Sequence, residues 1–278
     1  MKRKIENVAV WCVLLTTAVY FLFPVYWLIT TAIKQTKDIY TTTYVPFIQF
    51  QPDFSNLSLL IEVFRLGSPL ANSFIIATST ALLAVSIGSL AAYSLARFEF
   101  KGPLKNKDIS FWFLSQRMFP GIVLAIPFFI MMKNLGLLDT HLSVIMAHLS
   151  FTLPFAVLIM RSFFLEVPRE LEDSAAVDGC SRIQTFLRIA LPISAPGIVS
   201  TAILSFILSW NDFLFATILT LSNSQTMPVA ISAGVTPVGV MYWVIAVRAF
   251  AAILPPWLLA LAIQRYIVRG LTFGAVKG

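Results

Sequence analysis

The sequence predicts an all-α membrane protein with six transmembrane helices, both termini in the cytoplasm, and a cytoplasmic helix-turn-helix between the fourth and fifth spans. Hydrophobic residues make up 58% of the 278 residues and charged residues only 12%, a balance typical of membrane proteins. Long apolar runs recur along the chain, and Lys and Arg collect in alternate connections between them. No stretch of soluble composition is long enough to fold by itself, so residues 1–278 are expected to form a single domain.

Six apolar segments have the length of a membrane span. A hydrocarbon core about 30 Å thick requires about 20 residues of helix. The segments that meet this length are residues 8–33, 70–96, 109–132, 142–160, 195–221 and 238–264. The third contains Arg117, and the polar residues 222–227 separate the last two.

The orientation follows from the positions of Lys and Arg, which are held on the cytoplasmic side near span ends. The two termini together with the second-to-third and fourth-to-fifth connections hold fourteen basic residues, whereas the opposite set of connections holds four. Both termini are therefore predicted to be cytoplasmic. The net charge of +7 reflects this bias, so no nucleic acid is expected as a partner.

Two local patterns predict further details of the fold. Small residues recur every fourth position at Ala84, Gly88, Ala92 and Ala96, which favours close approach of another helix, in this chain or in a partner. Residues 52–64, PDFSNLSLLIEVF, lie in the longest polar connection and suit either a short surface helix or an ordered loop.

The connection between the fourth and fifth spans has an unusually polar composition, EDSAAVDGCSRIQTFLRIALP at residues 172–192. Pro168 suits the first position of a helix, acidic residues follow it, and Gly179 suits the left-handed position that ends a helix. A helix over residues 169–178 is therefore expected. Ser181 and Gln184 form a Ser-x-x-Gln capping box that begins a second helix through Arg188. Pro192 and Pro196 are expected to end that helix.

This connection resembles the signature of permease subunits in binding-protein-dependent ABC importers: Glu-Ala-Ala, three residues, Gly, nine residues, then Ile-x-Leu-Pro. Residues 173–175, Asp-Ser-Ala, stand at the Glu-Ala-Ala position, Gly179 follows after three residues, and residues 189–192 follow after nine. Asp173 and Ser174 depart from the signature, and the Asp side chain keeps the negative charge but reaches one methylene less far than Glu.

The resemblance extends to the maltose-type subgroup of these importers, which take up sugars and polyols. The stretches that carry it are NSFIIATSTALLAVSIGSLAAYSLARFEFKG at residues 72–102, SWNDFLFATIL at residues 209–219 and GLTFGAVKG at residues 270–278. It implies that the chain is a permease subunit of the cytoplasmic (inner) membrane, surrounded by lipid, that forms half of a carbohydrate pathway. The single domain of residues 1–278 is then an importer transmembrane permease domain.

The resemblance also implies the partners. These are a second, usually different permease, two cytoplasmic ATPase subunits and an extracytoplasmic substrate-binding protein. The chain contains no Gly-x-x-x-x-Gly-Lys-Ser/Thr phosphate loop. ATP and Mg²⁺ are therefore expected at the ATPase subunits, with no cofactor and no catalytic residue in this chain. The residues expected to couple this chain to the ATPase are Asp173, Ser174, Ala175, Asp178 and Gly179.

Ionisable residues inside predicted spans are expensive, so Asp212, Arg117 and Arg248 are expected to face a cavity or a partner rather than lipid. Asp212 could pair with an arginine in a purely structural contact, or these residues could line the substrate pathway. Gln116 and Asn211 could bond sugar hydroxyls in that pathway or bond across helices. The sequence leaves both interpretations open.

Other classes of function are less consistent with the sequence. An ion-driven secondary transporter would use Asp212 as its ion site and would transport alone, and an intramembrane enzyme would act without transport. His141 and His148 are seven residues apart and lack nearby ligands, so no metal site is expected. The charge-free residues 222–239 form a predicted outer loop, either a connector or a segment that helps to release substrate from the binding protein.

Overall fold

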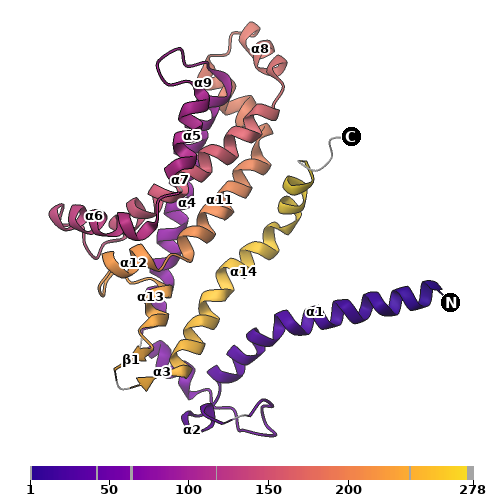
Figure 1. The fold of residues 1–278 in the computed structure, drawn as a ribbon, viewed down its shortest axis with the longest axis vertical. Coiled ribbons are helices and arrows are strands. Elements are labelled where there is room, and N and C mark those ends of the chain that lie inside the picture. Colours follow the sequence, from indigo (N-terminus) through magenta and orange to yellow (C-terminus); the bar gives the residue numbers. More distant parts are fainter. Residues whose placement is uncertain (1, 42, 63–64, 117, 238, 274–278) are drawn as a thin grey trace. The chain divides into compact units, whose positions relative to one another are not determined.

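The computed structural model describes residues 2–41, 43–62, 65–116, 118–237 and 239–273 (Figure 1). The described chain is mainly helical and divides into two compact units. Residues 1–70 and 227–255 form unit 1, and residues 71–226 and 256–278 form unit 2. The single domain over residues 1–278 stays a prediction, and each unit is described by itself below.

Unit 2 is a helical bundle. Its long helices are α4 (Gly67–Arg97), α5 (Asn106–Gln116), α7 (His141–Glu166) and α11 (Ala195–Trp210). Figure 1 shows these helices side by side along their length, and α7 packs against both α5 and α11. Two shorter helices, α6 (Gly121–Asn134) and α12 (Leu214–Leu219), pack against each other, and α12 also contacts α7.

The small-residue face of α4 is buried, as its spacing predicted. Ala84, Ala92 and Ala96 are inaccessible to solvent, or nearly so. A Cβ atom on Gly88 would lie 2.7 Å from the Cβ of Ala156 on α7, which is closer than two carbon atoms approach. The neighbour that these small residues admit therefore belongs to this chain.

Four helices of the described chain are long and apolar enough to cross a membrane. The qualifying segments are Ala9–Ala32, Gly67–Arg97, His141–Glu166 and Tyr242–Leu261. Two bent helix pairs bring the total to six if each pair counts as one span. The first pair is α5 (Asn106–Gln116) with α6 (Gly121–Asn134), bent by 87°. The second joins the helical residues Arg182–Ile193 to α11 at 78°.

The fifth predicted span, residues 195–221, does not form one continuous helix. Helix α11 ends at Trp210, and α12 begins at Leu214. Polar side chains take over backbone hydrogen bonds at this break: the Asn211 amide donates to the carbonyl of Ile207, and the Asp212 carboxylate accepts from the N–H of Ala216. Asn and Asp compete with helical hydrogen bonding in this way, which explains the interruption.

The predicted helix-turn-helix is present. Helix α8 spans Arg169–Val177, Gly179 has a φ of +83°, and Ser181 and Gln184 form the capping box at the start of α9 (Arg182–Thr185). One detail differs at the start, because Pro168 is the residue before the first turn of α8 rather than its first helical residue.

The helical residues that follow the capping box run past Arg188 and end at Ile193, between Pro192 and Pro196. A π-helical turn, η1 (Phe186–Ala190), leads into α10 (Leu191–Ile193), and the chain turns at Ser194 before α11. In this turn the N–H of Leu191 bonds to the carbonyl of Phe186, five residues back. Proline within a helix lacks an N–H and its ring meets the carbonyl four residues before it. The wider turn just before Pro192 relieves that conflict.

Unit 1 contains α1 (Lys2–Ala32), α2 (Thr36–Ile39), α3 (Ser55–Glu62), α13 (Met227–Ser232), strands β1 (Val235–Thr236) and β2 (Gly239–Val240), and the first part of α14 (Tyr242–Phe273). Helix α3 confirms the short helix, rather than an ordered loop, within residues 52–64. The two strands pair antiparallel, with Val235 opposite Val240. A buried cluster joins α3, α13 and α14 through Leu60, Leu66, Met227, Val244 and Val247.

A buried lysine fixes the connection after α1. Lys34 is almost completely inaccessible, and its ammonium group donates to the carbonyl of Thr43 at 2.5 Å. The same group lies over the rings of Trp27 and Phe50, 5.0 and 5.3 Å from their centroids. Burial lowers the pKa of Lys34, and Asp38 opposes that shift. These cation–π contacts hold the chain that leads to α2 and Tyr40.

Candidate functional site

The helix-turn-helix is fastened to α4 by a buried ion pair. The guanidinium Nε of Arg97 lies 2.7 Å from a carboxylate oxygen of Glu172 on α8, and the two side chains are only 7% and 12% exposed. The same guanidinium donates to the carbonyl of Val167, and the hydroxyl of Tyr93 donates to the other oxygen of Glu172 at 2.8 Å. Charge-assisted bonds of this kind are short and strong. Helix α8 is therefore locked onto the last turns of α4.

An aromatic cluster packs around Tyr93, which bonds to Glu172 of this ion pair. The ring of Tyr93 packs against Phe164 on α7 and Phe186 in η1, with centroid distances of 5.5 and 5.0 Å. On the other side, the guanidinium of Arg182 lies 4.9 Å from the ring centroid of Phe98. A small cleft of about 200 Å³ opens between these groups, lined by Arg169, Asp173 and Cys180 among others.

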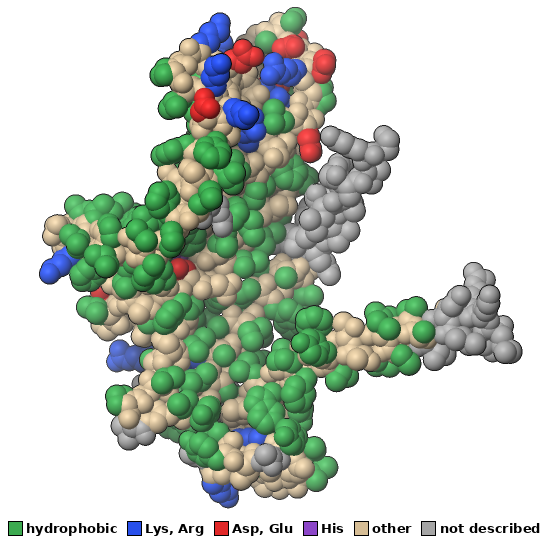
Figure 2. All heavy atoms as spheres, viewed as in Figure 1, with side chains coloured by type: hydrophobic (Ala, Val, Ile, Leu, Met, Phe, Trp, Pro, Cys, Tyr) green, Lys and Arg blue, Asp and Glu red, His purple; other side chains and the backbone are tan. Residues whose placement is uncertain are grey.

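The residues that the signature singled out differ in their exposure, and Asp173 also lines this cleft. Asp173, Ser174, Asp178 and Gly179 are exposed, and Ala175 is buried against the bundle. Two apolar side chains stand beside them in the open, Val177 at 88% and Ile183 at 72% exposure. Figure 2 shows acidic and basic side chains gathered around α8 and α9, at one end of unit 2. The exposed surface of the helix-turn-helix therefore combines apolar and charged side chains.

Glu172 was not among the residues expected from the sequence. The signature directs attention to Asp173, yet the structure gives Asp173 no ion pair within the described residues and gives Glu172 a buried one. The available signal was the helical period: Glu172 lies three residues before Ala175, so both face the bundle. Its partner, 75 residues away, could not be identified from that period.

Asp212 has a histidine partner in the structure, where the sequence suggested an arginine. The Nε2 of His148 on α7 lies 3.1 Å from a carboxylate oxygen of Asp212, and the Nδ1 lies 2.6 Å from the hydroxyl of Ser209 on α11. His148 is fully buried and the Asp212 side chain is 13% exposed. The cluster bridges α7, α11 and α12 at the α11 break, so it fixes how these helices meet.

This Ser-His-Asp arrangement does not form an accessible hydrolytic site. A nucleophilic serine must be reached by its substrate, and Ser209 is buried within the helix contact of α11 and α7. Within the described residues no group of three His, Cys, Asp or Glu side chains could hold a metal ion.

The remaining candidate pathway residues occupy different places. Asn211 is exposed and caps the end of α11, whereas Gln116 is half-buried at the end of α5. No hydrogen bond joins Gln116 to Asn211 in the part of the chain that the structure describes. Arg117 lies outside the described residues. Arg248, in unit 1, is buried on α14 and donates to the carbonyl of Ala230 on α13.

Asp139 anchors the segment that leads into the predicted outer loop. Its carboxylate accepts hydrogen bonds from the N–H groups of Leu221, Ser222, Asn223 and Ser224, and from the hydroxyl of Ser224. Burial raises the pKa of Asp139, but the four backbone N–H groups outweigh it and hold the pKa below its usual value. This carboxylate therefore stays ionised and keeps residues 221–224 wrapped around it.

A second contact holds the same segment from the other side. The side-chain amide of Asn72 donates to the carbonyls of Asn223 and Gln225, and its oxygen lies 2.8 Å from Nε2 of His141. Asp139 has a φ of +59°, a conformation that Asp tolerates better than most residues. Sequence analysis did not identify this anchor, because Asp139 and the N–H groups that it accepts from are more than 80 residues apart.

Comparison with known proteins assigns the chain to a class. Residues 84–273 match the family described as "Binding-protein-dependent transport system inner membrane component", and the chain belongs to this family. It is therefore a permease-type subunit of an inner-membrane transport system.

Individual relatives cover nearly the whole chain. It is 36% identical to the trehalose/maltose transport system permease protein MalG of Thermococcus litoralis, over 94% of this chain and 93% of that protein. It is 38% identical to the trehalose transport system permease protein SugB of Mycobacterium tuberculosis, over 96% of this chain and 97% of that protein.

Solved structures share the fold. A chain of a bacterial ABC transporter involved in the import of the acidic polysaccharide alginate superposes with a TM-score of 0.75 at 19% sequence identity, covering 96% of this chain and 98% of that chain. The MetNI methionine ABC transporter in an inward-facing conformation gives a TM-score of 0.56 at 18% identity, over 77% of this chain and 96% of that chain. At this level of identity the similarity concerns the fold.

Proposed function

We propose that this chain is the permease subunit of an ABC importer for a carbohydrate: a sugar, a polyol or a sugar derivative. It forms half of the translocation pathway together with a second permease, and it couples that pathway to two cytoplasmic ATPase subunits that bind ATP and Mg²⁺. An extracytoplasmic binding protein delivers the substrate. Relatives named for trehalose, maltose and diacetylchitobiose transport support the substrate class.

One observation carries the coupling part of this proposal. The helix-turn-helix is tied to the bundle on one side, through Glu172, and presents Val177 and Ile183 to solvent on the other. A partner that binds the exposed apolar side chains can move the helix-turn-helix. Because α8 is held to α4, that movement would pass to the membrane helices. Gly179 lets the chain turn sharply between the two helices, since its positive φ is strained for other residues.

An ion-driven secondary transporter is the second candidate, with Asp212 as its ion site. Membership in a binding-protein-dependent family favours the importer. The surroundings of Asp212 agree, because its carboxylate already bonds to His148 and to the N–H of Ala216. A carboxylate occupied in this way is suited to holding helices together.

The importer topology predicts that two polar connections of the chain are accessible from opposite sides of the membrane. In a background with Cys12 and Cys180 replaced by serine, a cysteine at Ser181 is expected to react with membrane-impermeant reagents only from the cytoplasmic side. A cysteine at Ser222 is expected to react only from outside. Both positions are exposed, whereas Ser224 is buried against Asp139 and is unsuitable for labelling. Labelling of both cysteines from one side would contradict six spans with cytoplasmic termini.

The coupling role predicts uncoupling by two substitutions on the exposed surface. Gly179→Val is strained at a φ of +83°, at a cost of roughly 1–2 kcal/mol. Asp173→Lys reverses the charge offered to a basic group of the ATPase. Each variant is expected to reach the membrane normally but to reduce uptake about tenfold or more, with ATP hydrolysis lost or no longer stimulated by the binding protein.

The matched control for these variants is Glu170→Gln, which changes an exposed acidic residue of the same helix. Assembly is checked by co-purification with the ATPase, and uptake and hydrolysis are measured in proteoliposomes. If Gly179→Val and Asp173→Lys assembled, hydrolysed and transported as the control does, the helix-turn-helix would have no coupling role.

A further inference from the structure

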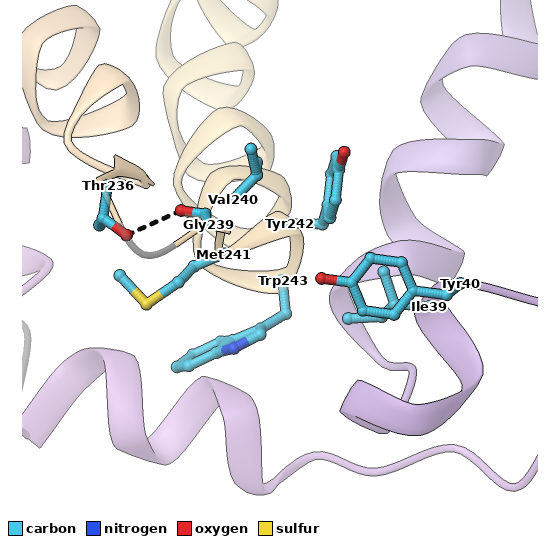
Figure 3. A pocket seen from close by; sticks show the side chains of 8 residues that line it. All are labelled: Ile39, Tyr40, Thr236, Gly239, Val240, Met241, Tyr242 and Trp243. Atoms are coloured by element: carbon cyan, nitrogen blue, oxygen red, sulfur yellow. Dashed lines mark hydrogen bonds between the residues drawn. The ribbon is translucent and has the colours of Figure 1, made fainter.

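Unit 1 contains an open pocket of about 460 Å³ beside the β1–β2 hairpin (Figure 3). Three aromatic residues line it: Tyr40, which directly follows α2, and Tyr242 and Trp243, which begin α14. The rest of the wall consists of Ile39, Met241 and the hairpin residues Thr236, Gly239 and Val240. In the proposed topology this pocket lies on the outer side of the membrane, where the binding protein would release its substrate.

The aromatic rings stand at angles that leave ring faces open to a ligand. Tyr40 and Tyr242 are both exposed, with ring centroids 5.8 Å apart and planes at 85°. Figure 3 shows the hydroxyl of Tyr40 pointing between Tyr242 and Trp243. Large aromatic rings usually lie in the protein interior, or mark a binding site when they are exposed together. Their arrangement around one cavity favours a binding site.

The polar groups of the pocket are neutral. None of its lining residues is charged, so it offers no ion pair to an acidic or basic ligand. Within the described residues the hydroxyls of Tyr40 and Tyr242 make no hydrogen bond to protein. The hydroxyl of Thr236 donates to the carbonyl of Gly239 at 2.7 Å and holds the hairpin shape. Ligand sites commonly combine apolar walls with a few such polar groups.

We propose that this pocket binds a neutral carbohydrate, with one sugar ring against the aromatic side chains of Tyr40, Tyr242 and Trp243. Sugars present an apolar C–H face that packs on an aromatic ring and hydroxyls at the rim that exchange hydrogen bonds with tyrosine. The proposal rests on the carbohydrate class of the proposed function. It adds a receiving subsite at the foot of the outer hairpin, at the start of the span Tyr242–Leu261 and separate from the residues expected to line the membrane pathway.

The test measures sugar binding directly. The full chain, assembled with its permease and ATPase partners in nanodiscs without the binding protein, is titrated with maltose and with trehalose and followed by saturation-transfer difference NMR. Signals are expected on the ring C–H protons of the sugar. Tyr40→Ala and Tyr242→Ala are each expected to raise the Kd about tenfold. Tyr40→Phe and Tyr242→Phe retain the ring and should show a smaller effect.

The matched control is Tyr20→Ala, because Tyr20 is an exposed aromatic of α1 outside the pocket and its removal should leave binding unchanged. The proposed sugar site would be rejected if neither sugar bound. It would also be rejected if Tyr40→Ala and Tyr242→Ala bound the sugars with the parental Kd. Uptake by the complex is measured in parallel. If the complex imports these sugars but the pocket does not bind them, only this inference is rejected. If the pocket binds them but the complex does not import them, the proposed function is rejected and the binding site is retained.

Discussion

Replacing Glu172 with lysine is expected to release α8 from α4 and to abolish coupled transport. The substitution leaves Arg97 buried beside a second positive charge and removes the acceptor of the Tyr93 hydroxyl. Removal of one partner from a buried pair costs about 3–5 kcal/mol, and the pair here is not completely buried, so about 3 kcal/mol is expected. This corresponds to roughly a hundredfold shift from docked to undocked α8. Uptake should fall to near background while hydrolysis persists.

Charge exchange provides the strongest test of this ion pair. The double variant Arg97→Glu with Glu172→Arg is expected to regain part of the lost uptake, and a double-mutant cycle then isolates the pairwise energy. Hydrogen exchange of the α8 amides in the assembled complex reports docking independently of transport. Glu172→Gln compared with Glu170→Gln controls for the loss of a negative charge. Equal behaviour of these two variants would mean that the ion pair does not transmit force.

Asp139→Ala is expected to loosen residues 221–224 and to weaken the response to the binding protein. The carboxylate accepts four backbone N–H groups, and each hydrogen bond to a charged group contributes about 1.5–3 kcal/mol. Water can replace several of these bonds at the exposed residues 221–223, so a total loss of about 3 kcal/mol is expected. Asp139→Asn tolerates the same left-handed backbone and keeps one accepting oxygen, so it should show a smaller loss.

The readouts for Asp139 separate a local effect from a general one. Amide exchange at residues 221–224 should accelerate, and binding-protein-stimulated ATP hydrolysis should fall severalfold, while basal hydrolysis and assembly are retained. Lys133→Ala, an exposed charge near the end of α6, serves as the control. Unchanged exchange at these amides in Asp139→Ala would show that the carboxylate does not order the loop.

The pH dependence of this anchor follows from the sign of its pKa shift. A carboxylate whose folded pKa is depressed contributes full stability above its unfolded pKa of about 3.9, and loses it only as the pH falls through the folded value. Acidification from pH 7 to pH 5 should therefore leave the protection factors of the amides of residues 221–224 unchanged, once the pH dependence of intrinsic amide exchange is taken into account. The loop anchor is constant over the pH range in which a transporter is normally assayed.

The sequence by itself determined those features that depend on neighbours within a few positions. Four of the six apolar runs, the capping box at Ser181, the positive φ of Gly179 and the close helix contact at Gly88 were confirmed. Each follows from a local rule: helix length, hydrogen-bonding geometry of a cap, or the absence of a Cβ atom. Family resemblance then placed the helix-turn-helix within an importer permease.

Only the tertiary structure decided which distant groups meet. Glu172 rather than Asp173 pairs with Arg97, His148 provides the partner of Asp212, and Asp139 binds the backbone of residues 221–224. The break between α11 and α12 belongs to the same class, since it depends on where the side chains of Asn211 and Asp212 find their partners. A residue's type fixes what it can bond, but helix packing fixes which partner comes within reach, and burial then makes that contact strong.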